Sequence, residues 1–226
     1  MKSYNLILTF LLAIWVGNAV ANDELSEIEV VGTSLLPGLE IEKEKLPYEV
    51  RSFQSGDLGN ESSLGVSDML NQNIPGVFTN EVQGSPYQGD VTFRGFRASS
   101  ILGAAQGLSV YIDGIRINEP FGDVVNWDMI PEYALDNVSL IPGSNPMYGL
   151  NTLGGALSLT TKSGLSHPGK AARVSFGSFS RKKLDVSVAG KFADGSDGDY
   201  FISASHFDES GWRDYSDGKI SNIFVK

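Results

Sequence analysis

The sequence predicts an α+β fold, in which a small mixed β-sheet is combined with short helices, followed by a series of antiparallel strands. Three observations support this prediction. Apolar and polar residues alternate over several short runs, as they do in half-buried strands. Residues 63–73 instead have the spacing of a short amphipathic helix. The chain also has 26 glycines among 226 residues, which favours tight turns between short elements.

Residues 1–21 are predicted to form a secretory signal peptide. Lys2 precedes a nearly all-apolar run, residues 6–16, and Ala19–Ala21 has the small-x-small pattern of a signal-peptidase site. The run is shorter than the ~20 apolar residues that a membrane-spanning helix needs. We therefore expect an exported mature chain that starts at Asn22. Because no later stretch is long and apolar enough for a membrane helix, any membrane role would depend on β-structure.

The composition argues against several classes of function. The formal net charge is −10, whereas nucleic-acid binding needs clustered Lys and Arg. The chain has no cysteine, which excludes disulfides, thiolate zinc sites and cysteine nucleophiles. Its two histidines, His167 and His206, are far apart in sequence. We therefore expect no metal centre, no cofactor and no serine triad.

Three stretches resemble functional motifs but lack essential residues. Gly149–Ala156 has the glycine spacing of a phosphate-binding loop without its Lys and hydroxyl residue. Gly107–Tyr111 begins like a nucleophile elbow, but Tyr111 stands where the second Gly belongs. Asp194–Asp199 carries carboxylates without the spacing of a calcium loop, and a solvated turn explains it as well. We predict that the protein is not an enzyme.

Residues 22–45 are predicted to form an acidic, irregular tail with one β-prone segment. An extended segment of this kind can pair with the edge of a partner's sheet through main-chain hydrogen bonds. Such pairing depends little on side-chain identity, so the pattern is loose. The segment consists of Glu27, Ile28, Glu29, Val30, Val31, Gly32 and Thr33.

Residues 46–162 are predicted to form the folded domain. Residues 46–53 have the pattern of its first strand. A helix is expected to open at Ser63-Leu64, run to Asn73 and stop at Pro75-Gly76. Residues 91–93 alternate in a further strand that ends at an Arg-Gly pair, for which we expect a structural role.

A β-hairpin is predicted at Asp113-Gly114. Residues 108–112 alternate between apolar and polar, and the Asp-Gly pair separates them from the β-prone residues 115–117. Both positions of a two-residue hairpin loop favour positive φ, which Asp-Gly supplies. A short helical turn is then expected within residues 129–137.

Val138–Lys162 is the segment around which the domain is organised. Alternating residues at its two ends predict two strands. Between them lie Pro142-Gly143, Tyr148-Gly149 and Gly154-Gly155, which are turn-forming residues or positions where backbone passes close to backbone. We therefore expect two strands that enclose a tight, glycine-punctuated loop.

Together these motifs resemble the plug domain of TonB-dependent outer-membrane receptors. The chain departs from the family pattern at Pro142, where the family usually has Arg, so no arginine contact is expected there. The motifs that carry the resemblance are Ser63-Leu64, Asp68–Leu70, Pro75–Val77, Arg94, Gly95, Asp113, Gly114, Tyr148, Gly149, Gly154, Gly155 and Thr160–Lys162.

The resemblance implies a coupling segment and a ligand site. Residues 27–33 would be the TonB box, which binds TonB of the inner-membrane energy-transducing complex. Loops 80–89, 97–107 and 118–127 would face outward and help to bind a small molecule such as an iron–siderophore, haem, cobalamin or an oligosaccharide. For each single residue in them, ordinary loop packing is the simpler explanation. The candidate ligand contacts are Tyr87, Gln88, Arg97, Ser99, Gln106, Phe121 and Trp127.

After Lys162 a polar linker, residues 163–169, precedes longer alternating segments at 172–179, 183–192 and 199–207. This alternation is typical of transmembrane β-barrel strands, although a soluble sandwich has the same pattern. The linker and the Gly211–Tyr215 segment, which is similar to an early barrel loop of the family, favour the barrel. We therefore interpret residues 163–226 as the linker and about three first strands of a truncated outer-membrane barrel.

The sequence as a whole predicts the front part of a receptor in the outer membrane, because a plugged transporter of this kind has about 22 strands. The tail and plug would be accessible from the periplasm, and the plug would gate the barrel during energy-coupled uptake. The alternative is a soluble periplasmic interaction protein that has a plug-like domain and no pore.

Overall fold

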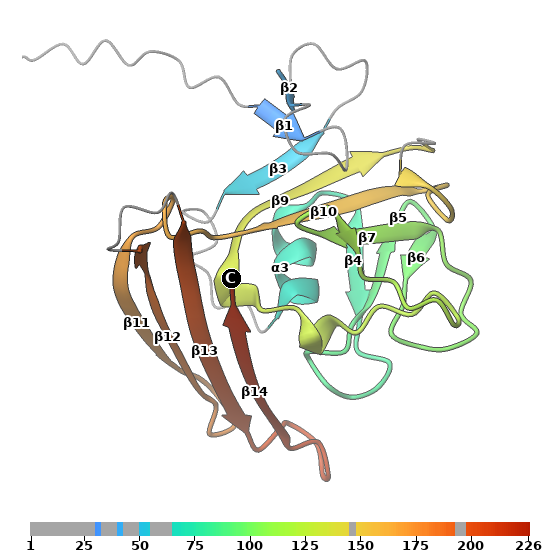
Figure 1. Ribbon diagram of the computed structural model, residues 1–226. Coiled ribbons are helices and arrows are strands. Elements are labelled where there is room, and N and C mark those ends of the chain that lie inside the picture. Colours follow the sequence, from blue (N-terminus) through green and yellow to red (C-terminus); the bar gives the residue numbers. More distant parts are fainter. Residues whose placement is uncertain (1–29, 33–39, 43–49, 55–64, 145–147, 193–197) are drawn as a thin grey trace, which may run out of the picture.

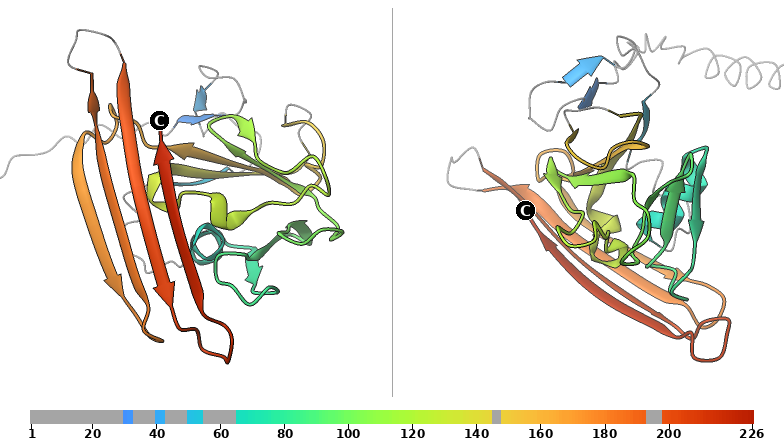
Figure 2. Two further views of the ribbon diagram at one scale, coloured as in Figure 1. Left: turned by 60° about the horizontal axis from the view of Figure 1, so that its bottom comes forward. Right: turned by 90° about the vertical axis from the view of Figure 1, so that its right-hand side faces the viewer.

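The structure is a computed structural model that describes residues 30–32, 40–42, 50–54, 65–144, 148–192 and 198–226. It consists of an α+β body, residues 50–161, and a curved antiparallel sheet, residues 169–225, which we call the wall (Figures 1 and 2). This arrangement confirms the predicted fold class. No helix in the described part of the chain has the length and apolar character needed to cross a membrane. The predicted signal peptide lies outside the described residues, as do 27–29 and 33 of the predicted TonB box.

A five-stranded mixed sheet forms the centre of the body. Its strands β7 and β10 are parallel, whereas β9 is antiparallel to both of its neighbours, β3 and β10. The two predicted strands of the Val138–Lys162 segment are therefore present and paired with each other. In spatial order the strands are β3 (Arg51–Gln54), β9 (Leu135–Pro142), β10 (Gly155–Thr161), β7 (Leu108–Ile112) and β8 (Ile115–Arg116).

One helix and a second small sheet complete the body. Helix α3 (Val66–Asn73) buries Val66, Met69 and Leu70 in the main core and ends before Pro75-Gly76, as predicted. Its predicted start at Ser63-Leu64 lies outside the described residues. The second sheet packs beside it and has three antiparallel strands, β4 (Val77–Asn80), β5 (Asp90–Phe93) and β6 (Phe96–Ala98).

Two tight turns join neighbouring strands of the body. Asp113 and Gly114 have φ of 48° and 80°, which confirms the predicted hairpin between β7 and β8. Arg94 and Gly95 have φ of 51° and 86° and join β5 to β6. The Arg94 guanidinium lies 5.0 Å from the centre of the Phe93 ring. This placement in a turn fits the structural role that we expected for the Arg-Gly pair.

Two 3₁₀ turns link β8 to β9, where the sequence predicted a short helical turn. They are η2 (Trp127–Met129) and η3 (Glu132–Ala134). In the tail, β1 (Val30–Gly32) pairs antiparallel with β2 (Glu40–Glu42). Part of the predicted TonB box is therefore extended and hydrogen-bonded within the chain.

The wall is a meander of four antiparallel strands in sequence order. The sequence predicted about three, and the expected extent of the first, 172–179, was wrong at both ends. The strand begins at Gly169, within the predicted linker, and Phe179 and Ser180 have positive φ and form the turn before the next strand. The fourth strand was missed because apolar residues occur on both of its faces. The strands are β11 (Gly169–Phe176), β12 (Lys182–Lys191), β13 (Asp199–Glu209) and β14 (Gly218–Val225).

The two faces of the wall differ in composition and exposure. The face toward the body buries small, polar and aromatic side chains, among them Asp185, Phe201, Ser203 and Phe207. The opposite face is open, and its side chains are mostly apolar. On that face Val174, Phe176, Leu184, Val186, Ile202, Ile223 and Val225 are exposed.

Candidate ligand site in the loops of the body

Four loops of the body are hydrogen-bonded to one another. Loop A (81–89) joins β4 to β5, loop B (99–107) joins β6 to β7, and loop C (117–126) joins β8 to η2. Loop D (143–154, without 145–147) joins β9 to β10. Loops A, B and C overlap the predicted ligand loops, although Arg97 lies in β6 and Trp127 in η2. Loop D was predicted only as a structural turn.

Hydrogen bonds tie the four loops to one another. Between loops A and B, Gln83 Nε2 donates to the Ser100 carbonyl at 3.2 Å, and Ser100 Oγ donates to the Gln88 carbonyl at 3.4 Å. Between loops B and C, the Val125 amide donates to the Ser99 carbonyl at 2.9 Å. Between loops B and D, the Gly154 amide donates to the Gly107 carbonyl at 2.9 Å. Displacing one loop therefore disturbs its neighbours.

Asn118 is the buried centre of loop C. Its Oδ1 accepts from the Val110 amide at 2.7 Å, and its Nδ2 donates to the Leu108 carbonyl at 3.1 Å. These backbone groups lie on the edge of β7 beyond the short strand β8, so the Asn118 amide takes the place of a missing strand. Because buried backbone groups without partners are costly, this side chain fixes where loop C leaves the sheet.

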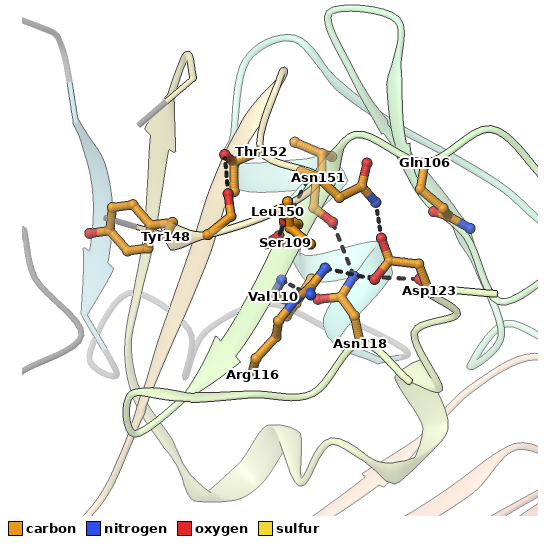
Figure 3. A network of polar contacts seen from close by, with 12 residues as sticks. Gln106, Ser109, Val110, Arg116, Asn118, Asp123, Tyr148, Leu150, Asn151 and Thr152 are labelled. Carbon is orange, nitrogen blue, oxygen red and sulfur yellow. Dashed lines mark hydrogen bonds and ion pairs between the residues drawn. The ribbon is translucent and has the colours of Figure 1, made fainter. Parts of the chain in front are cut away.

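Asp123 joins loop C to β8 and to loop D (Figure 3). Its Oδ1 lies 2.7 Å from Arg116 Nη2, and its Oδ2 accepts a hydrogen bond from Asn151 Nδ2. Asp123 and Asn151 have φ of 56° and 63°, a conformation that Asp and Asn adopt more readily than most other residues. A single carboxylate therefore bridges two turns that are distant in sequence.

Strand β7 holds loop D through the side chains on its second face. Ser109 Oγ donates to the Leu150 carbonyl at 2.9 Å, and the Tyr111 hydroxyl donates to the Tyr148 carbonyl. Tyr111 and Tyr148 also share a small core with Val50, Ile141 and Ala156. Burial raises the pKa of Tyr111, and the nearby Arg116 opposes this shift. Tyr111 is therefore a neutral donor at physiological pH.

The glycines of the predicted Gly-Gly pair are needed for close approach. A Cβ on Gly155, which has φ of 147°, would lie 2.4 Å from the Ile141 carbonyl oxygen. A Cβ on Gly154 would lie 2.5 Å from Cβ of Phe96. Gly149, with φ of 72°, has open space around it and serves the turn alone. The structural motif thus allows β9, β10 and β6 to pack together.

Two predicted ligand contacts, Trp127 and Ser99, lie in the interior. The Trp127 side chain is 1% exposed, and its Nε1 donates to the Ala98 carbonyl at 3.0 Å. Ser99 is fully buried; its Oγ accepts from the Ile101 amide, and its own amide donates to Gln106 Oε1 at 2.9 Å. These residues, together with Gln106, position loop B rather than present free polar groups at its surface.

Tyr87 and Gln88 lie at the end of loop A. The Tyr87 ring packs edge-on against Phe207 of the wall, with 4.8 Å between the ring centres. Burial raises the pKa of Tyr87 well above its usual value, and its hydroxyl has no hydrogen-bond partner among the described residues. Tyr87 therefore faces the wall, and the Gln88 carbonyl serves the contact to loop B described above.

Arg97 and Phe121 are the predicted contacts that reach the surface. Arg97 is half exposed and lies 3.2 Å from the buried Asp90 carboxylate, so its charge is already balanced. Phe121 is 77% exposed at the tip of loop C. Other exposed apolar side chains lie in loops A, B and D, namely Val82, Leu102, Leu150 and Leu153.

The loops therefore offer exposed apolar side chains around a hydrogen-bonded polar network. This combination is suited to binding a bulky small molecule. Within the described residues no group of His, Cys, Asp or Glu could hold a metal ion. The seven predicted ligand contacts do not converge on one cavity and remain predictions.

Sequence reasoning missed Asn118, Asp123 and Asn151. Each is a short polar residue in a loop of Pro and Gly, where a turn is the usual explanation. The available signal was the Asn-x-x-x-x-Asp spacing directly after the Asp-Gly hairpin, because it places both side chains beside the unpaired edge of β7.

Comparison with known proteins identifies similar chains. A family model described as the TonB-dependent receptor plug domain matches residues 42–156. The ferric aerobactin receptor of Klebsiella pneumoniae is 28% identical over 99 residues, which are 44% of this chain and 12% of that receptor.

Two solved structures have the same fold. The alcaligin outer-membrane receptor of Bordetella pertussis has a TM-score of 0.62 and 14% identity, covering 87% of this chain and 31% of that one. The ferric preacinetobactin receptor of Acinetobacter baumannii has a TM-score of 0.59 and 16% identity, covering 80% of this chain and 25% of that one. The chain thus spans less than a third of the length of these relatives.

Proposed function

Because the chain belongs to the TonB-dependent receptor plug family, we propose that it forms the gated entrance of an outer-membrane receptor for energy-coupled uptake. The body is the plug, and the wall is the part of the barrel against which the plug rests. The observation that carries this proposal is the pairing of a plug-type body with an antiparallel sheet whose outer face is open and apolar. Such a face is suited to lipid. A soluble periplasmic protein would expose it to water.

The ligand is a scarce small molecule of the ferric siderophore class. The aerobactin and preacinetobactin receptors are named for ferric ligands, and the alcaligin receptor for a ligand of its own. The exposed apolar residues of loops A to D would contact such a ligand, which would be cargo rather than a cofactor. Uptake of a ligand as cargo requires no catalytic residue, and we propose that the protein is not an enzyme.

TonB would bind the chain through residues 27–33. The described part of this segment, Val30–Gly32, is already extended as β1, which is the conformation needed to join a partner's sheet. Ligand binding at the outer loops would make the segment available to TonB. A pull on it would then rearrange the plug and open a path through the barrel.

The experiment compares Val30→Pro with Val30→Ala in the receptor that carries this chain. Proline removes the backbone donor and fixes φ, whereas alanine retains both the donor and the backbone freedom. Ligand binding to whole cells and energy-dependent uptake are measured in parallel. We expect Val30→Pro to bind normally and to lose uptake, while Val30→Ala retains both. Normal uptake by Val30→Pro would reject the assignment of the coupling segment.

A further inference from the structure

A cluster of buried charges lies where the body meets the wall, away from loops B, C and D. Glu132 of η3 and Lys183 of β12 form an ion pair at 2.8 Å, and both side chains are less than 15% exposed. Tyr133 lies beside this pair. Lys162 Nζ is 4.9 Å and the Arg173 guanidinium 5.1 Å from the centre of the Tyr133 ring. The body and the wall thus meet through charges rather than through an apolar surface alone.

Asp185 is the exception in this cluster. It is 1% exposed, and neither of its carboxylate oxygens has a hydrogen-bond partner among the described residues. It lines a small cavity together with Glu132, Lys183 and Tyr87, whose hydroxyl is also without a described partner. A buried carboxylate without a hydrogen-bond partner is costly, so Asp185 destabilises the docked arrangement.

Possible partners for Asp185 are close by on the wall itself. Arg173 is directly opposite Asp185 in the register of β11 and β12, so both side chains lie on the same face. Lys183 is two residues away on that same face of β12. In the docked arrangement both cations are engaged by the body, Lys183 by Glu132 and Arg173 by the Tyr133 ring.

The charges are also divided between the two parts. The body contributes Glu132 and Asp136, and Lys162 directly follows it and is hydrogen-bonded to Ala134; the wall contributes Arg173, Lys183 and Asp185. Burial and the neighbouring Arg173 lower the pKa of Lys162, while Asp136, Asp185 and Glu132 oppose this. When the body leaves the wall, two cations and one anion are exposed on the wall, and these can form ion pairs with one another.

We propose that the charged residues between the body and the wall act as a switch in which ion-pair partners are exchanged. In the docked state they hold the body on the wall, and the exchange lowers the free energy needed to release it. In the docked state Lys183 pairs with Glu132, and Arg173 lies over Tyr133. In the released state both cations turn to Asp185. This exchange rests on the proposed function only in its consequence, namely that release of the plug precedes uptake; the docking equilibrium itself can be measured without ligand or TonB.

A thiol reporter makes the equilibrium visible, because residues 1–226 contain no cysteine that would react in its place. Ser203 lies on the covered face of β13 and is 4% exposed, so a Ser203→Cys side chain reacts with a maleimide only when the body lifts away. The labelling rate of the purified receptor in detergent, without ligand and without TonB, then reports the released fraction.

Glu132→Gln and Asp185→Asn are expected to change this rate in opposite directions. Glu132→Gln removes the docked partner of Lys183 and should accelerate labelling about tenfold, a change equivalent to 1.4 kcal/mol. Asp185→Asn removes the released-state partner and the strained buried carboxylate, and should slow labelling by a similar factor. If the charged cluster only stabilised the contact between the body and the wall, the Ser203→Cys side chain would instead be labelled faster in both variants.

Two controls separate this exchange from misfolding. Asp208→Asn, on the open face of the same sheet, should leave the rate unchanged. The charge-swapped pair Glu132→Lys with Lys183→Glu restores a docked ion pair and removes one released-state partner of Asp185, so it should label more slowly than Glu132→Gln. Faster or unchanged labelling in Asp185→Asn would overturn the proposal, even if uptake by the receptor proves to work as described above.

Discussion

The body and the wall are both built from alternating strands, but they bury those strands in different ways. In the body, β7 sends Leu108 and Val110 into the main core and Tyr111 into a second core behind the sheet. In the wall, β12 buries Asp185 against the body and leaves Leu184 and Val186 exposed. Period-two alternation therefore identifies a strand, while the surroundings of its two faces depend on what the rest of the fold places there.

The connections differ in the same sense. The loops of the body are held by side chains such as Asn118 and Asp123, which bridge distant backbone groups. The linker before the wall is a compact turn in which Asp199 Oδ2 accepts from the amides of Gly164 and Leu165 at 2.6 and 3.2 Å. The loops of the body are thus held by polar side chains that reach across distant segments, whereas the linker before the wall is held by one carboxylate.

The largest expected effect comes from placing a charge on equivalent strands of the two parts. Val110→Lys puts an ammonium group in a fully buried core and should cost more than about 4 kcal/mol, so that the body does not fold. Val186→Lys lies on the open face and should cost about 2–4 kcal/mol in a bilayer. Yield and unfolding of both variants in lipid and in detergent measure the difference. Equal loss in both would contradict the comparison.

Glycine substitutions should separate the cost of a steric clash with a neighbouring strand from the cost of a positive φ alone. Gly155→Ala introduces a Cβ that would lie 2.4 Å from the Ile141 carbonyl, at a positive φ, and should destabilise the body by about 3 kcal/mol. Gly169→Ala at the start of β11 has a positive φ but no neighbour within 4 Å, so about 1 kcal/mol is expected. Chemical denaturation of the two variants should preserve this order.

Removing the amide that replaces a strand should have an intermediate effect. Asn118→Ala leaves the Val110 amide and the Leu108 carbonyl without this partner and should cost about 2 kcal/mol. Asn126→Ala removes an exposed contact to Glu119 in the same loop and should change stability by less than about 0.5 kcal/mol. If urea unfolding showed a comparable loss of stability in both variants, the hydrogen bonds of Asn118 to β7 would not be the main support of loop C.

The smallest effect is expected at the contact between the two parts. Tyr87→Phe retains the ring against Phe207 and removes a buried hydroxyl that has no described partner, so stability at pH 7 should change by less than about 1 kcal/mol. Because burial raises the folded-state pKa of Tyr87 above the ordinary value of 10.0, the native protein should lose stability as the pH rises past 10.0. Stability of the Phe variant should fall less over that range. If stability fell equally with pH in the two proteins, the raised pKa would not belong to Tyr87.

Local signals in the sequence predicted local structure. The Asp113-Gly114 turn, the stop of α3 at Pro75-Gly76 and the two strands of Val138–Lys162 depend on neighbouring residues, and all three are present. The parallel pairing of β7 with β10 brings together segments about fifty residues apart. Alternation does not specify such a partner. Strand β14 was missed because Ile220 and Phe224 face the body while Ile223 and Val225 face outward.

The candidate site was harder to predict than the fold. The predicted segments are loops in the structure, but their role in ligand binding stays a prediction, because a ligand contact and a core residue use the same aromatic side chains. Trp127 illustrates this, because its indole is enclosed and hydrogen-bonded to Ala98. The supporting residues Asn118, Asp123 and Asn151 act across loops, and only a three-dimensional arrangement brings them together (Figure 3).

The oxygen accessibility of spin labels along β12 distinguishes a lipid-facing wall from a water-facing one. Single cysteines at positions 184 to 188 and, in the body, 108 to 112 can be labelled in a chain that has none of its own. In the membrane-embedded receptor we predict that 184, 186 and 188 are accessible to oxygen but not to a water-soluble nickel chelate. Positions 185, 187 and 108 to 112 should be protected from both. Access of the nickel chelate to 184, 186 and 188 would show that the open face of the wall meets water rather than lipid, and would contradict the account.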